Sequence, residues 1–130
     1  MDTDFSHPPD FIINLISAIK QDDIDCVIAS RYVPGGIMNS NKIKFLLSKL
    51  MNLLIGKVLN LRIKDLTGGF FVIKKSLLNN LDYNKVFVGY GDYFYRIFYD
   101  LRDIKYSFKE IPFKYIGRKK GISKTNTIKM

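Results

Sequence analysis

The first residues of the chain carry side chains that could bind a divalent metal ion. Asp2 and Asp4 flank Thr3 in the segment MDTDFS, and Ser6 is the next candidate ligand. In an extended turn, two carboxylates at this spacing can point the same way and share one hard cation through oxygen ligands. An exposed acidic terminus is the alternative interpretation of the same residues.

Three further segments carry residues suited to phosphate groups. Arg31 ends the apolar run CVIASR, and open α/β sheets tend to bind ligands where a strand ends. Its planar guanidinium matches a phosphate. The segment DLTGGF joins an acid, a hydroxyl and two glycines that let backbone amides approach a ligand, although an ordinary turn has the same pattern. A basic loop or a solvated tail surrounds Gly121, with Arg118, Lys119, Lys120 and Lys124.

The single cysteine and the single histidine do not indicate further chemistry. Cys26 lies in an apolar run and is interpreted as a buried reduced thiol, because one cysteine cannot form a disulfide framework or a thiolate metal cluster. His7 precedes Pro8 and is interpreted as structural. The first residues do not form a secretory signal, which favours a reducing compartment.

Helices and strands must position these segments, and the sequence pattern predicts where they lie. Apolar residues recur at helical spacing over 10–20, and a continuous apolar run over 26–29 predicts a strand buried on both faces. A Pro-Gly-Gly turn makes 31–36 a loop. The long apolar segment 41–61 is interrupted by lysines and polar residues, which disfavours a membrane span. It is typical of an amphipathic helix that covers the core or lies on a bilayer surface.

The second half of the chain continues the alternation. A β-rich run follows DLTGG, SLLNNL predicts a short helix, and KYSFKEIPFKYI predicts a strand up to Pro112. Between them a helix is predicted from one apolar stripe: Phe94, Ile97, Phe98 and Leu101. The last segment, from Gly117, is expected to be loop. The fold class is therefore α/β, in one domain over 1–130.

The apolar fraction and the net charge limit the classes of function that fit this chain. Apolar residues make up 47% of the chain, which excludes a disordered tail. The formal net charge is +9, so an anionic partner is expected: nucleic acid, membrane head groups or phosphorylated substrates. A merely soluble, lysine-rich surface is the alternative.

Six motifs in order resemble the signatures of the polyprenol-phosphate (dolichyl-phosphate) mannosyltransferases: MDTDFSHPP, VIASRYVPGG, LLSKLMN, KDLTGGFFVIKKSLL, EIPFKY and GRKKGISK. These enzymes are inverting family-2 glycosyltransferases with a GT-A fold. The resemblance implies mannose transfer from GDP-mannose to a polyprenyl phosphate by an enzyme peripheral to the cytoplasmic face of a membrane such as the endoplasmic reticulum. Nucleic acid is not an implied partner.

The resemblance also assigns residues. Asp2, Asp4 and Ser6 match the metal motif, which holds Mg²⁺ or Mn²⁺. Positions that handle the lipid phosphate are matched by Arg31, Lys44 and Ser48, although the family usually has arginine at the second of these. Arg118, with Lys124 beside it, matches the arginine near the donor diphosphate. Asp4 and Arg118 are the residues expected to act in catalysis.

The family has a donor-nucleotide half ahead of its acidic motif, and the motif stands here at the first residues. We therefore expect the C-terminal portion of a GT-A fold with a Rossmann-like, incomplete sheet, inactive or dependent on a companion chain that supplies the other half. We also expect an exposed sheet edge and poor solubility of the isolated chain. One alternative is a non-catalytic remnant that binds lipid phosphate or an intact transferase. A nucleic-acid-binding module is less favoured, because no aromatic-basic stacking motif is present.

Overall fold

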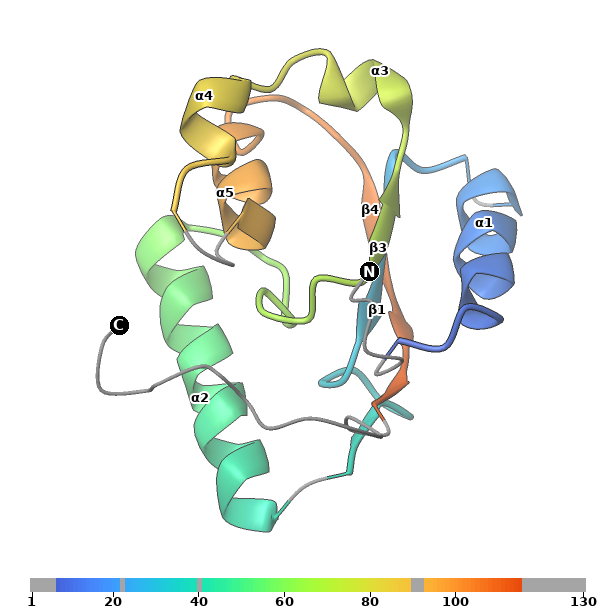
Figure 1. Ribbon diagram of the computed structural model, residues 1–130, viewed down its shortest axis with the longest axis vertical. Helices are drawn as coiled ribbons and strands as arrows, with labels where there is room; N and C mark the ends of the chain where they lie inside the picture. Colours follow the sequence, from blue (N-terminus) through green and yellow to red (C-terminus); the bar gives the residue numbers. More distant parts are fainter. Residues whose placement is uncertain (1–6, 22, 40, 90–92, 116–130) are drawn as a thin grey trace.

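The computed structural model describes residues 7–21, 23–39, 41–89 and 93–115, and Figure 1 shows how its helices and strands are arranged. The helices are α1 (Phe11–Gln21), α2 (Lys42–Leu59), α3 (Lys75–Leu78), α4 (Tyr83–Val86) and α5 (Tyr93–Asp100). The strands are β1 (Cys26–Ser30), β2 (Ile37–Met38), β3 (Phe71–Ile73), β4 (Phe108–Pro112) and β5 (Lys114–Tyr115). The predicted α/β class is confirmed.

The central sheet is mixed, with the strand order β3-β1-β4. Strand β1 runs antiparallel to β3 and parallel to β4, so that Cys26 pairs with Phe108 and Ser30 with Pro112. All five residues of β1 are buried, as its uninterrupted apolar run predicts. A second, smaller sheet pairs β2 with β5 in parallel beyond the end of β4.

Side chains of β1 alternate between two hydrophobic cores. Val27 and Ala29 pack with Leu15 of α1, whereas Cys26 and Ile28 belong to the core that contains α5. Figure 1 accordingly shows α1 on one side of the sheet and α2 and α5 on the other. Cys26 is free and buried, which confirms the prediction of a buried thiol, and burial raises its pKa to about 12.

The ring of His7 is also buried. It stacks on the ring of Phe70 with the centroids 4.7 Å apart and is tilted against Phe113. His7 therefore packs the start of the described chain against the segment that precedes β3. This packing is what the structural interpretation of the histidine predicts.

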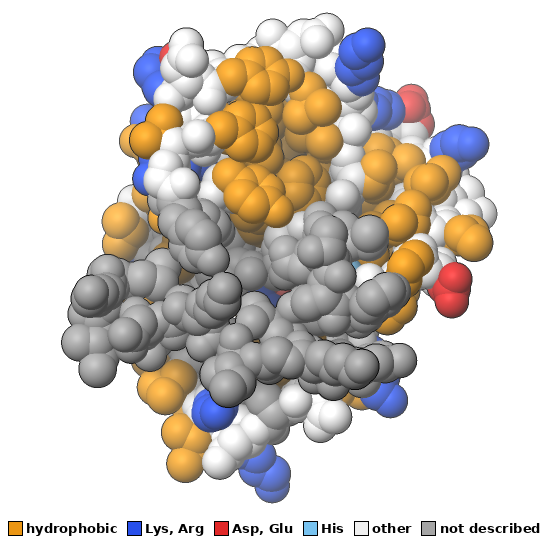
Figure 2. Space-filling view, viewed as in Figure 1, with side chains coloured by type: hydrophobic (Ala, Val, Ile, Leu, Met, Phe, Trp, Pro, Cys, Tyr) orange, Lys and Arg blue, Asp and Glu red, His pale blue; other side chains and the backbone are white. Residues whose placement is uncertain are grey.

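The predicted apolar stripe lies on helix α5 and the residue that follows it, and all four of its side chains are buried. Next to it an aromatic stack is open to solvent: the ring of Tyr83 stacks on Phe87, which stacks on Tyr93. Figure 2 shows hydrophobic side chains gathered at the top of the molecule, where Figure 1 draws α4 and α5.

Helix α2 is apolar on its outer face. It begins after Asn41, whose side chain accepts a hydrogen bond from the backbone N–H of Ile43, and it ends at Asn60 in the left-handed conformation. Large apolar side chains are exposed along it by 49% to 81%: Ile43, Leu46, Leu47, Leu50, Met51, Leu53, Leu54 and Val58. Among the helices of the described residues, none has the length and apolarity that crossing a bilayer requires.

The helices expected over 10–20 and 41–61 and the strand expected over 26–29 are confirmed within one or two residues, whereas α3 ends three residues earlier and β4 begins three residues later than predicted. The sequence did not predict β2, α4 or β5, which are two to four residues long. Elements this short depend on their tertiary neighbours and leave no periodic pattern. The loop expected from Gly117 lies outside the described residues.

Candidate functional site

The structure describes three of the residues that the sequence predicted for a site: Arg31, Lys44 and Ser48. The other five lie outside the described residues: Asp2, Asp4, Ser6, Arg118 and Lys124. Among the described residues, no group of three or more metal-ligating side chains could hold a metal ion. The three described residues are therefore the ones that the sequence predicted for the lipid phosphate.

Arg31 is held by a buried ion pair with Asp65. Its Nε donates to Asp65 Oδ2 at 2.8 Å and its Nη2 to Oδ1 at 2.7 Å, while its backbone N–H donates to Oδ2 at 2.9 Å. The two side chains are 10% and 0% exposed. Burial alone would lower the pKa of the Arg31 guanidinium, but the hydrogen bonds and charge of Asp65 raise that pKa above its usual value. The guanidinium is a permanent, oriented cation.

The contacts with Asp65 use only part of the Arg31 guanidinium. Nη1 makes no hydrogen bond to any of the described residues, whereas Nε and Nη2 face Asp65. The rings of Tyr32 and Tyr115 lie under the cation, with their centroids 5.1 Å and 5.8 Å from its central carbon. Arginine held in this way keeps donors for a phosphate without having to order its own side chain.

Two glycines allow this close packing. A Cβ on Gly68 would lie 3.0 Å from the carboxylate of Asp65, and one on Gly36 would lie 2.6 Å from the carbonyl oxygen of Ser30. The sequence predicts that the two glycines of DLTGGF let backbone amides approach a ligand. The structure shows that Gly68 instead makes room for the Asp65 carboxylate, which faces Arg31.

Glu110 of β4 fixes the segment that carries Asp65. Its two carboxylate oxygens accept hydrogen bonds from the backbone N–H groups of Lys64 and Asp65 at 3.0 Å and 3.1 Å. Sequence reasoning missed this contact, because Glu110 is 45 residues away from Asp65 and appears only as one polar residue of an alternating strand.

Ser48 lies on the inner face of α2 and contacts Tyr32, the neighbour of Arg31. Its Oγ lies 2.6 Å from the hydroxyl oxygen of Tyr32. Burial raises the pKa of Tyr32 above its usual value, outweighing the opposite effects of Arg31 and of this hydrogen bond, so the phenol stays protonated at neutral pH. If the phenol donates to Ser48, the serine proton is left for a ligand.

Lys44 is exposed and stands one helical turn before Ser48, on the same side of α2. No hydrogen bond or ion pair joins it to any of the described residues. The structure thus brings Arg31 and Ser48 together through Tyr32 and leaves Lys44 at the surface near them.

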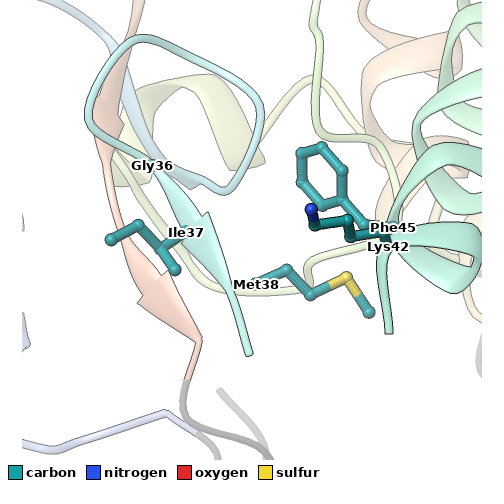
Figure 3. A pocket seen from close by; sticks show the side chains of 5 residues that line it. All are labelled: Gly36, Ile37, Met38, Lys42 and Phe45. Atoms are coloured by element: carbon teal, nitrogen blue, oxygen red, sulfur yellow. The ribbon is translucent and has the colours of Figure 1, made fainter. Parts of the chain in front are cut away.

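A pocket of about 240 Å³ adjoins this site between β2 and the start of α2. Figure 3 shows its walls, with Ile37 and Met38 on one side and the ring of Phe45 and the ammonium group of Lys42 on the other. The ring of Phe45 lies 5.6 Å from that of Tyr32, which contacts Ser48. It offers an apolar surface beside a cation.

Comparison with known proteins shows to which family this chain is similar. The model of the family described as "Glycosyl transferase family 2" matches residues 1–82. The chain is 32% identical over 127 residues to a polyprenol monophosphomannose synthase of Mycolicibacterium smegmatis, an alignment that covers 95% of the chain and 47% of that relative. It is 36% identical over 90 residues to a dolichol-phosphate mannosyltransferase of Pyrococcus furiosus, covering 66% of the chain and 25% of the relative.

The chain therefore spans about half the length of the first of these curated relatives and a quarter of the second. The match agrees with the expected fold class, because a mixed sheet between helices fits part of a GT-A fold. The family is in general dependent on divalent metal ions.

Replacement of Asp65 by asparagine tests the buried ion pair. Asp65→Asn leaves the Arg31 cation buried without a counter-charge, so we expect the free energy of unfolding to fall by about 3 kcal/mol. The matched control is Asp103→Asn, which removes an exposed pair with Arg102 and should leave the free energy of unfolding nearly unchanged. Urea unfolding measures both, and equal losses would show that the buried pair has no special weight.

Proposed function

Because the chain belongs to glycosyl transferase family 2, we propose that it is part of an enzyme that transfers mannose from GDP-mannose to a polyprenyl phosphate. The observation that carries this proposal is the 32% identity, over 95% of the chain, to a polyprenol monophosphomannose synthase. A second relative named dolichol-phosphate mannosyltransferase supports the same acceptor class. The geometry around Arg31 supports an anionic ligand at the described part of the site.

The acceptor phosphate has to be positioned by the enzyme, but it needs no base to make it a nucleophile. A monophosphate has a second pKa of about 6, so at neutral pH one of its oxygens is already a nucleophile. That oxygen forms a bond to C1 of mannose while the bond from C1 to the diphosphate breaks. We assign Nη1 of Arg31, the hydroxyl of Ser48 and the ammonium of Lys44 to the acceptor phosphate. Fixed donors of this kind hold the acceptor phosphate in place for attack without reorganising.

The metal and the donor diphosphate are assigned to residues outside the described part. The carboxylates of Asp2 and Asp4 and the hydroxyl of Ser6 are an all-oxygen donor set, which fits Mg²⁺ or Mn²⁺. When bound, such an ion neutralises charge on the leaving diphosphate. Arg118 and Lys124 add positive charge on the donor side, with Asp4 and Arg118 as the catalytic residues.

We further propose that α2 lies on the cytoplasmic surface of a membrane, as in the endoplasmic reticulum. Its outer face combines eight exposed apolar side chains with lysines, which is the pattern of an interfacial helix. Each lysine near an anionic surface contributes about 1 kcal/mol. The polar inner face, which carries Ser48, would then receive the phosphate of a lipid held in that surface.

The chain alone is proposed to lack transfer activity. It spans about half of a relative that is named as a synthase, so a companion segment is assigned the donor nucleotide. The alternative is a non-catalytic protein that binds lipid phosphate or an intact transferase.

A transfer assay tests the proposed reaction. We expect no mannosyl transfer from GDP-mannose to dolichyl phosphate by the purified chain with Mn²⁺ in detergent. Transfer should begin when the part of the M. smegmatis relative that this chain does not span is added, and Asp4→Ala should abolish it. Transfer by the chain alone, lost in Asp4→Ala, would contradict the need for a companion. Absence of transfer in both mixtures would favour the non-catalytic alternative.

Vesicle binding tests the role of α2. The triple variant Leu46→Gln, Leu50→Gln, Leu54→Gln removes one apolar stripe while keeping good helix formers, and binding to vesicles of phosphatidylcholine and phosphatidylserine should weaken about tenfold or more. The control, Ile13→Gln with Ile16→Gln, alters exposed apolar residues of α1 instead. Equal binding by both variants in co-sedimentation would argue against an interfacial α2.

A further inference from the structure

A network of hydrogen bonds links Arg31 to Ser48, two of the three described residues that are assigned to the phosphate. Arg31 Nη2 donates to Thr67 Oγ1 at 3.0 Å, and the Asn52 amide donates to the same oxygen at 3.0 Å. The Asn52 amide also donates to the carbonyl oxygen of Ser48 at 2.8 Å. The hydroxyl of Ser48 forms a hydrogen bond with the hydroxyl of Tyr32. Tyr32 is the next residue after Arg31, so the network returns to Arg31 through a peptide bond.

The side chain of Asn52 contacts three different residues in this network: Ser48, Thr67 and Leu66. Its side chain oxygen accepts from the backbone N–H of Leu66 at 2.6 Å, so both ends of the amide are used. The residue is 1% exposed in the middle of an 18-residue helix whose outer face is apolar. Asparagine is not a favoured residue inside a helix, and a purely apolar side chain here would leave the buried N–H of Leu66 without its partner.

Thr67 is the second junction. It is an exposed residue of the segment between α2 and β3, yet its hydroxyl oxygen lies between Arg31 and Asn52. Apolar packing does not require threonine at an exposed position. The hydroxyl therefore has a task that the fold alone does not explain.

We propose that Asn52 and Thr67 are positioning residues, which hold the guanidinium of Arg31 and the hydroxyl of Ser48 at the separation needed to bind one lipid phosphate together. This inference rests on the proposed acceptor class. Asp65 fixes the orientation of the guanidinium, whereas Thr67 and Asn52 fix the turn of α2 that carries Ser48 relative to it. Neither positioning residue has to touch the ligand.

Thr67→Val removes the shared oxygen and nearly keeps the side-chain shape, and Thr67→Ser retains the oxygen as the matched control. The probe is farnesyl phosphate, with farnesol as the uncharged comparison, titrated against the full chain. We expect Thr67→Val to bind farnesyl phosphate about fivefold more weakly than the wild type and Thr67→Ser to bind as the wild type does. Thermal unfolding of both variants, measured alongside, shows whether each is folded at the temperature of the titration.

A double-mutant comparison separates positioning from simple structural damage. Ser48→Ala should weaken binding of farnesyl phosphate by about fivefold in the wild-type background and hardly at all with Thr67→Val, because serine is no longer aligned there. Equal effects of Ser48→Ala in the two backgrounds would overturn the proposal. If Thr67→Val does not fold, Asn52→Asp, which retains the acceptor for Leu66 but loses both donors, takes its place in the comparison.

Failure of the proposed function would look different. If the wild type did not prefer farnesyl phosphate to farnesol, the acceptor assignment would fall, and the positioning proposal with it. If the wild type had that preference and Thr67→Val kept it at full strength, only the positioning proposal would be overturned.

Discussion

The buried ion pair between Arg31 and Asp65 is the interaction on which the described site depends. Two charges can leave water only together, so the end of β1 and the segment after α2 must meet. Glu110 then secures that segment from β4. Gly68 permits the close approach, since a Cβ there would lie only 3.0 Å from the carboxylate. The site is thus ordered by contacts within the protein, before a ligand arrives.

Helix α2 departs from the usual arrangement of a surface helix, although its inner face also packs Ile55 against the core. Most helices turn apolar residues to the core and polar ones to water. Here the inner face carries Ser48 and Asn52, which join the polar network, and the outer face is apolar. Within the described residues, part of what holds α2 in place is therefore hydrogen bonding. Such a helix suits a position between a charged site and an apolar medium.

The sequence predicted the elements with long periodic patterns and the buried strand, because hydrophobic spacing alone determines which face they bury. It could not predict the partner of Arg31. DLTGGF offers an acid that could equally face a ligand, and only the tertiary structure turns Asp65 toward the strand end. Asn52 was missed for a related reason. In the sequence it looks like one more polar interruption of a lysine-containing helix, whereas its burial depends on contacts with a segment fourteen residues later.

The central claim is that Arg31, oriented by Asp65, offers its remaining donors to a lipid phosphate. Nuclear magnetic resonance of the arginine side chains tests it most directly, with Arg31→Lys to assign the signals. Addition of farnesyl phosphate should shift the Nη resonances of Arg31 and leave its Nε resonance, which reports the bond to Asp65, nearly unchanged; farnesol should shift neither. Unchanged Nη resonances at saturating farnesyl phosphate, or a shift of Nε that signals a broken ion pair, would contradict the account.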